Sequence, residues 1–211
     1  MKRRARPAAA AAALALIATP LSAQVGENMG LVNPNLASSS ELGAVLGLSG
    51  DAVEALEARR PYLRMSEVHE VVSQHVAESG WEGVYRALWL PIDLNDVTDE
   101  EILLIPGVGD RMLHEFEEYR PYIGLAQFHR EIGKYVDDDE LARMAQYVYV
   151  RIDLNTASEE AILSIPGVGN RMLHEFEEYR PYTAMAQFRR EMAKYVDDYE
   201  VERLARYVEI R

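Results

Sequence analysis

The chain of 211 residues contains no cysteine. Disulfide bonds, thiolate metal sites, a cysteine nucleophile and a lipid-bearing cysteine are therefore excluded. Basic residues are also scarce, since 22 Lys and Arg stand against 35 Asp and Glu for a formal charge of −13. A chain this acidic is repelled at long range by nucleic acids and by anionic membranes. Stability has to come from the packing of the chain itself.

Long apolar runs are missing too, because no stretch approaches the ~20 apolar residues of a membrane-spanning helix. Residues 1–23 have the order of a secretory signal peptide: four basic residues, a short apolar run over 8–18, and small residues before Gln24. We expect a cleaved signal peptide over 1–23, a linker over 24–31, and export to the periplasm or the extracellular space. Removing the four basic residues from the charge of −13 leaves −17 for the mature chain.

What the sequence does contain is an internal repeat of 60 residues. Ile92-Asp93-Leu94-Asn95 recurs at 152–155, and Gly107-Val108-Gly109 recurs as Gly167-Val168-Gly169. The same offset applied backwards places residues 60–62 on the Arg-Pro-Tyr of 120–122 and 180–182. We therefore expect three units, over 32–91, 92–151 and 152–211.

Within each unit the apolar spacing is helical, and no segment alternates with the period of a strand. Thr98 with Glu101 and Ser38 with Glu41 are capping boxes, and Ser158 keeps the cap without the reciprocal Glu. A second helix is expected from about Asp110 to Tyr119, followed by a third and by a fourth that Asp137 caps. The predicted fold class is all-α.

The turn between the first two helices reads Ile-Pro-Gly-Val-Gly in units two and three. Two glycines around one apolar residue suit a tight turn with positive φ and close approach by another molecule. The valine is expected to tuck inward, so that amides of the turn and of the following helix start point outward. Free N–H groups at a helix start bind oxyanions such as a DNA phosphate, which Arg111 or Arg171 could also reach.

The string "IDLNTASEEAILSIPGVGNRMLHEFEEYRPY" resembles the helix-hairpin-helix domain of the competence DNA receptor family ComEA. It is also similar to domains of photosystem II extrinsic protein U and of type II secretion pseudopilin K. The resemblance covers 92–211 well and 32–91 faintly. It implies a helix-hairpin-helix fold in three tandem repeats, and these relatives include protein-binding members as well as DNA-binding ones.

Carried over by position, the resemblance implies sequence-nonspecific DNA contacts through the turn backbone and the nearby arginines. The expected contact residues are Gly107, Val108, Gly109, Arg111, Gly167, Val168, Gly169 and Arg171. Hairpins of this family also hold a monovalent cation on turn carbonyls. Here the corresponding carbonyls are those of Leu103, Ile105, Val108, Leu163, Ile165 and Val168.

The sequence departs from the family pattern in two places. The usual second glycine hairpin is replaced by "EIGKYVDD" and "EMAKYVDD", which we expect to pack rather than bind. In unit one, Ser49 replaces the second glycine and Asp51 stands where Arg111 does. Because serine disfavours positive φ and a carboxylate repels phosphate, we expect unit one to be a degenerate, structural cap.

Other readings of the polar residues are weaker. His114 with Glu118 has the spacing of helical metal ligands, but a third ligand is missing, so a solvated face is expected. Tyr62, Tyr122 and Tyr182 are expected to anchor the core rather than to stack on bases. No catalytic constellation is visible, which points away from an enzyme. The leading hypothesis is a non-catalytic DNA-binding module, and the alternative is an envelope scaffold that binds a protein.

Overall fold

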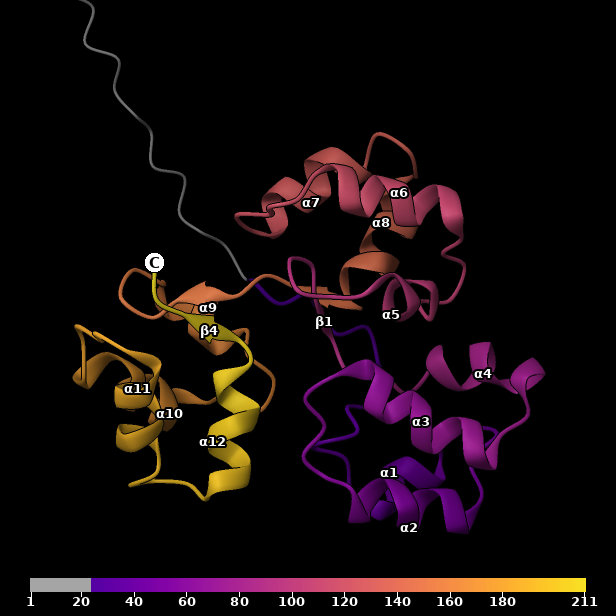
Figure 1. The fold of residues 1–211 in the computed structure, drawn as a ribbon, viewed down its shortest axis with the longest axis horizontal. Coiled ribbons are helices and arrows are strands. Elements are labelled where there is room, and N and C mark those ends of the chain that lie inside the picture. Colours follow the sequence, from indigo (N-terminus) through magenta and orange to yellow (C-terminus); the bar gives the residue numbers. More distant parts are fainter. Residues whose placement is uncertain (1–23) are drawn as a thin grey trace, which may run out of the picture.

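The computed structural model describes residues 24–211. In it, each repeat folds into four short helices, and the first and last residues of the repeat pair in parallel. The expected signal peptide, 1–23, lies outside the described residues. Figure 1 shows the repeats as three groups placed around a common centre. The protein is mostly helical, as predicted, with only a few two-residue strands in the part of the chain described.

The helices of repeat one are α1 Ser39–Gly43, α2 Gly50–Ala58, α3 Met65–His75 and α4 Glu78–Tyr85. The elements of repeat two are β1 Ile92–Asp93, α5 Asp99–Leu103, α6 Asp110–Glu118, α7 Leu125–Ile132, α8 Asp138–Ala145 and β2 Val148–Tyr149. Those of repeat three are β3 Ile152–Asp153, α9 Glu159–Leu163, α10 Asn170–Glu178, α11 Met185–Met192, α12 Asp198–Ala205 and β4 Val208–Glu209.

The predicted helix starts are confirmed by the caps. Ser38 and Thr98 form capping boxes with Glu41 and Glu101, and Ser158 accepts a hydrogen bond from the N–H of Ala161 without a reciprocal carboxylate. Asp137 accepts from the N–H of Glu140 at the start of α8. These side chains satisfy amides that a helix start leaves without partners, which explains why such short helices begin where they do.

Each repeat is closed by pairing its first residues with its last. Ile92 pairs with Val148 in the parallel pair β1–β2, and Ile152 pairs with Val208 in β3–β4. A single bridge from Val32 to Leu88 does the same in repeat one. The closure brings the turn after the first helix close to the last helix of the same repeat.

The recurring Asn and Arg-Pro-Tyr residues hold the repeat together. In repeat two, Asn95 donates to the carbonyl of Tyr122 at 2.8 Å and accepts from its N–H at 2.7 Å. Arg120 donates to the carbonyls of Leu94 at 2.7 Å and Val97 at 3.2 Å. Tyr122, like its counterparts Tyr62 and Tyr182, is fully buried, which confirms the prediction that these tyrosines are core anchors.

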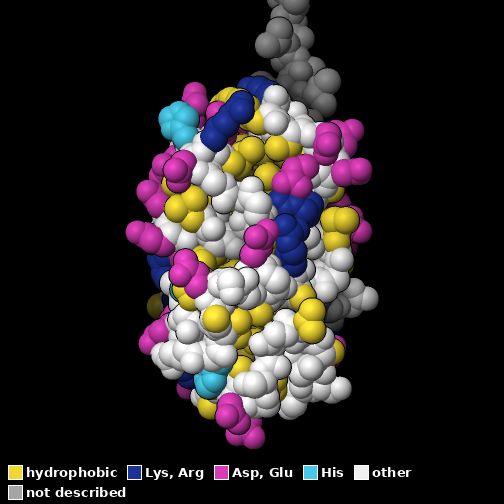
Figure 2. All heavy atoms as spheres, turned by 90° about the vertical axis from the view of Figure 1, so that its right-hand side faces the viewer, with side chains coloured by type: hydrophobic (Ala, Val, Ile, Leu, Met, Phe, Trp, Pro, Cys, Tyr) yellow, Lys and Arg dark blue, Asp and Glu magenta, His cyan; other side chains and the backbone are white. Residues whose placement is uncertain are grey.

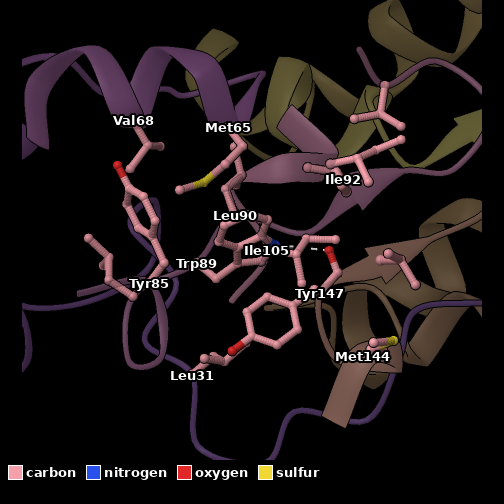
Figure 3. Close-up of a cluster of buried hydrophobic side chains, with 14 of the residues drawn as sticks. Leu31, Met65, Val68, Tyr85, Trp89, Leu90, Ile92, Ile105, Met144 and Tyr147 are labelled. Carbon is pink, nitrogen blue, oxygen red and sulfur yellow. Dashed lines mark hydrogen bonds between the residues drawn. The ribbon is translucent and has the colours of Figure 1, made fainter. Parts of the chain in front are cut away.

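Repeats one and two share a single hydrophobic core, whereas repeat three has a second core, which Tyr149 of repeat two joins. Trp89 lies at the junction: its side chain is 1% exposed and its Nε1 donates to the carbonyl of Tyr147 at 2.9 Å. Figure 3 shows this hydrogen bond and the apolar side chains of both repeats around the indole, Met65 and Val68 among them. Two of the three repeats are therefore expected to unfold together.

Polar contacts close the arrangement of the three repeats. Ser66 donates to Glu101 at 2.9 Å between repeats one and two, and Tyr199 donates to the carbonyl of Asn35 at 2.9 Å between repeats three and one. The segment 24–31, which we expected to be a linker, begins beside β2, where Val25 bridges to Tyr149 and Gly26 donates to the carbonyl of Val148. This segment also joins the core of repeat three through Val25.

Candidate nucleic-acid interface

The turn before α6 has one glycine with a left-handed conformation, not two. Gly107 has φ 81°, whereas Gly109 has φ −124° and ψ −176°, which is extended backbone. Gly167 and Gly169 repeat these values at 81° and −119°. Only the first glycine of each pair is required by its φ, because L side chains rarely adopt that region. The second glycine is the N-cap residue of the following helix.

That geometry overturns our argument about Ser49. Gly47 in repeat one also has a positive φ of 99°, so the same turn forms there. Ser49 stands at the extended position, with φ −85°, and its side chain accepts from the N–H of Ala52 at 3.2 Å. Serine is therefore compatible with the turn, and the expectation that its φ preference disrupts this turn was wrong. What Ser49 changes is the helix start, which it caps with its own hydroxyl.

In repeats two and three the corresponding helix starts carry no such cap. Gly109 and Gly169 provide no side-chain hydrogen bond. The first backbone hydrogen bond at the start of α6 runs from the N–H of Leu113 to the carbonyl of Gly109. In α10 the N–H of Leu173 donates in the same way to the carbonyl of Gly169. The N–H groups of residues 110–112 and 170–172 thus have no partner inside their helices. Free amides and the helix dipole together favour an anion at these two places.

The predicted contact residues lie together around these helix starts. Gly107, Gly109 and Arg111 are exposed, as are Gly167, Gly169 and Arg171. Val108 is buried at 9% exposure, which confirms its inward orientation, while Val168 is half-buried. Within residues 24–211, neither Arg111 nor Arg171 makes an ion pair. Both guanidinium groups are therefore free for an external anion.

Of the three glutamates of α6, one is buried and two lie beside other side chains of the same segment. Glu115 is buried at 8% exposure, and its Oε2 has no hydrogen-bond partner among the described residues. Glu117 lies 3.6 Å from Arg120, and Glu118 lies 3.8 Å from the exposed ring of His114. The carboxylate nearest in sequence to the helix start is Asp110, which is Asn170 in repeat three.

The resemblance also implied a cation on the turn carbonyls and a packing role for the segment that replaces the second hairpin. The carbonyls of Ile105 and Ile165 each already accept a hydrogen bond at 3.0 Å, from Val108 and Val168. In the segment that replaces the second hairpin, the ammonium of Lys134 lies 5.0 Å from the centroid of the Tyr119 ring, but most of residues 133–138 are exposed. That this segment packs rather than binds therefore stays a prediction. In the described part of the chain, no group of three His, Asp or Glu side chains converges as metal ligands.

The surface as a whole is acidic. Figure 2 shows acidic side chains scattered over one face, where basic side chains gather in only a few small groups. None of the helices in residues 24–211 has the length and apolarity needed to cross a bilayer. Comparison of the chain with protein families, curated proteins and solved structures found no match.

Two features of the site could not be read from the sequence. Leu36 of repeat one lies beside the turn of repeat three, where a Cβ on Gly167 would be 3.3 Å from a leucine methyl. Arg143 and Arg203 lie behind the two turns from the last helix of each repeat. Both are tertiary contacts between residues far apart in the chain, although the recurrence of Arg143 as Arg203 was a visible signal.

Proposed function

We propose that this protein is an exported, non-catalytic DNA-binding module of the helix-hairpin-helix type. Repeats two and three would each hold a phosphate of the DNA backbone without reading sequence. The observation that carries the proposal is the pair of exposed helix starts without a side-chain cap. Two residues beyond the second glycine, each helix has an exposed arginine that makes no ion pair among the described residues. The likeness of their sequences to the ComEA family points in the same direction.

The acidic composition weakens long-range attraction to DNA but leaves the local contact intact. At physiological salt the Debye length is about 8 Å, so charges farther than this from the bound phosphate are largely screened. Glu117 lies beside Arg120, and Glu115 is buried in the protein, as described above. Asp110 is the local exception, and we infer that repeat three, with Asn170 at that position, binds phosphate more strongly than repeat two.

Repeat one is proposed to be structural. Its helix start is already capped by Ser49, and Asp51 brings a negative charge to the position of the two arginines. Its core is continuous with that of repeat two, so repeat one would stabilise the phosphate-binding repeat two. Export of the mature chain rests on the order of charges and apolar residues in 1–23.

A protein ligand is the alternative, and the charge of the chain favours it. The mature sequence carries −17, and exposed apolar side chains such as Leu46 at 89% and Ile123 at 67% could join an interface. A basic or neutral protein of the cell envelope would then bind the acidic surface, and the chain would act as a scaffold.

A salt titration tests the proposal. Fluorescence anisotropy of a labelled generic duplex should show binding at 50 mM salt that weakens about tenfold by 200 mM. The slope of the logarithm of affinity against the logarithm of salt should correspond to about two phosphate contacts, one per turn. A folded protein that fails to bind duplex at low salt would exclude the DNA reading and leave the protein ligand.

A further inference from the structure

An arginine of the last helix in repeat three lies against the turn. Arg203 on α12 is 1% exposed, and its Nε and Nη2 each donate to Glu200 at 2.6 Å. Its Nη1 donates to the carbonyl of Pro166 at 2.5 Å. A Cβ on Gly167 would stand only 3.1 Å from Nη2, so the guanidinium occupies the space directly behind the glycine.

Repeat two has the same arrangement with one bond fewer. Arg143 on α8 donates to both oxygens of Glu140 at 2.6 Å, and its Nη2 would be 3.3 Å from a Cβ on Gly107. Its Nη1 is buried and has no hydrogen-bond partner among the described residues. The arginine thus approaches the turn of repeat two without bonding to its carbonyl.

Repeat one lacks the arginine altogether. Gly83 stands at this position, and a methyl of the next residue, Val84, lies 3.3 Å from where a Cβ on Gly47 would be. An apolar side chain therefore suffices to pack behind the turn. A buried ion pair is a costly way to fill the same space, because both charges lose their hydration. The arginine occurs only in the two repeats whose helix starts are uncapped.

The bond to Pro166 fixes the direction of a neighbouring amide. The peptide unit between Pro166 and Gly167 is planar and trans, so its C=O and its N–H point in opposite directions. Because Arg203 holds the carbonyl inward, the N–H of Gly167 faces outward, next to the amides of the α10 start. A hydrogen bond from a charged donor is stronger than one between neutral groups, which suits it to holding a turn.

We propose that Arg203, and more weakly Arg143, are positioning residues that orient the turn amides outward as part of the anion site. The orienting role stands on geometry alone, and only the identity of the anion rests on the proposed DNA-binding function. Arg203 would not touch the DNA itself, because its side chain is almost fully enclosed.

Hydrogen exchange in the full-length protein tests the orienting role without DNA. In Arg203→Met, the amide of Val168 should exchange about tenfold faster, since the turn loses one charge-assisted hydrogen bond. Arg203→Lys should restore part of this protection, because an ammonium can still donate to Pro166. Arg189→Met is the matched control: Arg189 also pairs with a glutamate of α12, Glu202, at 2.7 and 3.0 Å, but in an exposed position.

Unchanged exchange at Val168 in Arg203→Met, with a thermal stability equal to that of Arg189→Met, would overturn the proposal. DNA binding gives a second readout. Arg203→Met should lower affinity about tenfold with the salt slope unchanged, whereas a slope smaller by about 1 would mean that Arg203 contacts phosphate directly, against the proposal. If the wild type binds no DNA, the DNA-binding function fails, and the exchange data still decide the role of Arg203.

Discussion

Asn155 is joined to the backbone of Tyr182 by two hydrogen bonds. Its Nδ2 donates to the tyrosine carbonyl at 2.9 Å, and its Oδ1 accepts from the tyrosine N–H at 2.7 Å. Asn35 and Asn95 make the same pair of bonds to Tyr62 and Tyr122. The residue therefore ties the start of each repeat to the segment after its second helix.

Replacing Asn155 by Ala should lower the free energy of unfolding by about 2–3 kcal/mol. The variant loses two hydrogen bonds and leaves backbone groups of Tyr182 without partners in a largely enclosed place. Because repeat three has its own core, protection from hydrogen exchange should fall in 152–211 more than in 32–151. Thr156→Ala, in the adjacent exposed position, is the control and should cost about 1 kcal/mol or less. Equal losses in both variants would contradict the role given to Asn155.

Trp89 should be the side chain on which repeats one and two depend together. Trp89→Ala removes a fully buried indole and is expected to cost about 3–5 kcal/mol in urea unfolding. Repeats one and two should lose exchange protection in concert, since they share one core. Trp81→Ala removes a tryptophan that is only partly buried, and it should cost less. Loss of protection confined to repeat one in Trp89→Ala would show that the two repeats are independent.

Stability should fall as the pH drops below neutral. Desolvation lowers the pKa of His69 and of His129 below the ordinary value of 6.5, although the ring of His129 lies at an exposed position. Just below pH 6.5 the unfolded chain therefore binds more protons than the folded one, and protonation pulls the equilibrium toward unfolding. The two histidines contribute their full stabilisation above the pKa of the unfolded chain. This stabilisation is lost as the pH falls from that value through the lower pKa values of the folded protein.

Thermal unfolding of the double variant His69→Gln and His129→Gln checks this pH dependence. The variant should lose less stability between pH 7.5 and pH 5 than the wild type does. His114→Gln, which changes an exposed ring, serves as the control. A pH profile identical to that of the wild type would show that neither His69 nor His129 contributes.

The two free arginines should carry the salt dependence of DNA binding. Arg111→Gln combined with Arg171→Gln is expected to reduce the salt slope by about 2 and to weaken binding by at least tenfold at 100 mM salt. Arg130→Gln combined with Arg190→Gln removes the same charge from another pair of equivalent positions, each beside its own glutamate. That control should leave the slope nearly unchanged. Equal effects of the two double variants would point to general electrostatics rather than to the turns.

Local signals in the sequence were sufficient for the helices. The Ser and Thr caps, the proline after Arg120 and the acidic cap at Asp137 each act within a few residues, and the structure confirms them. The inward tyrosines could also be predicted, because Tyr122 follows directly on the proline that ends the second helix.

Contacts between distant segments could not be predicted in this way. The closing strands are two residues long, too short for any periodicity to show. The pairing of Val25 with Tyr149 and the bond from Tyr199 to Asn35 depend on how the repeats pack together. The compatibility of Ser49 with the turn could not be predicted from the Gly-Val-Gly pattern, because the pattern does not show that only the first glycine has a positive φ.

The central claim is that amides at the two uncapped helix starts accept DNA phosphates, and amide resonances measured during titration with a short duplex test it most directly. The account predicts the largest shifts at Gly109 to Arg111 and Gly169 to Arg171, with little change at the capped start around Ser49. Shifts concentrated on other surfaces, or no shifts in a folded protein at low salt, would contradict it.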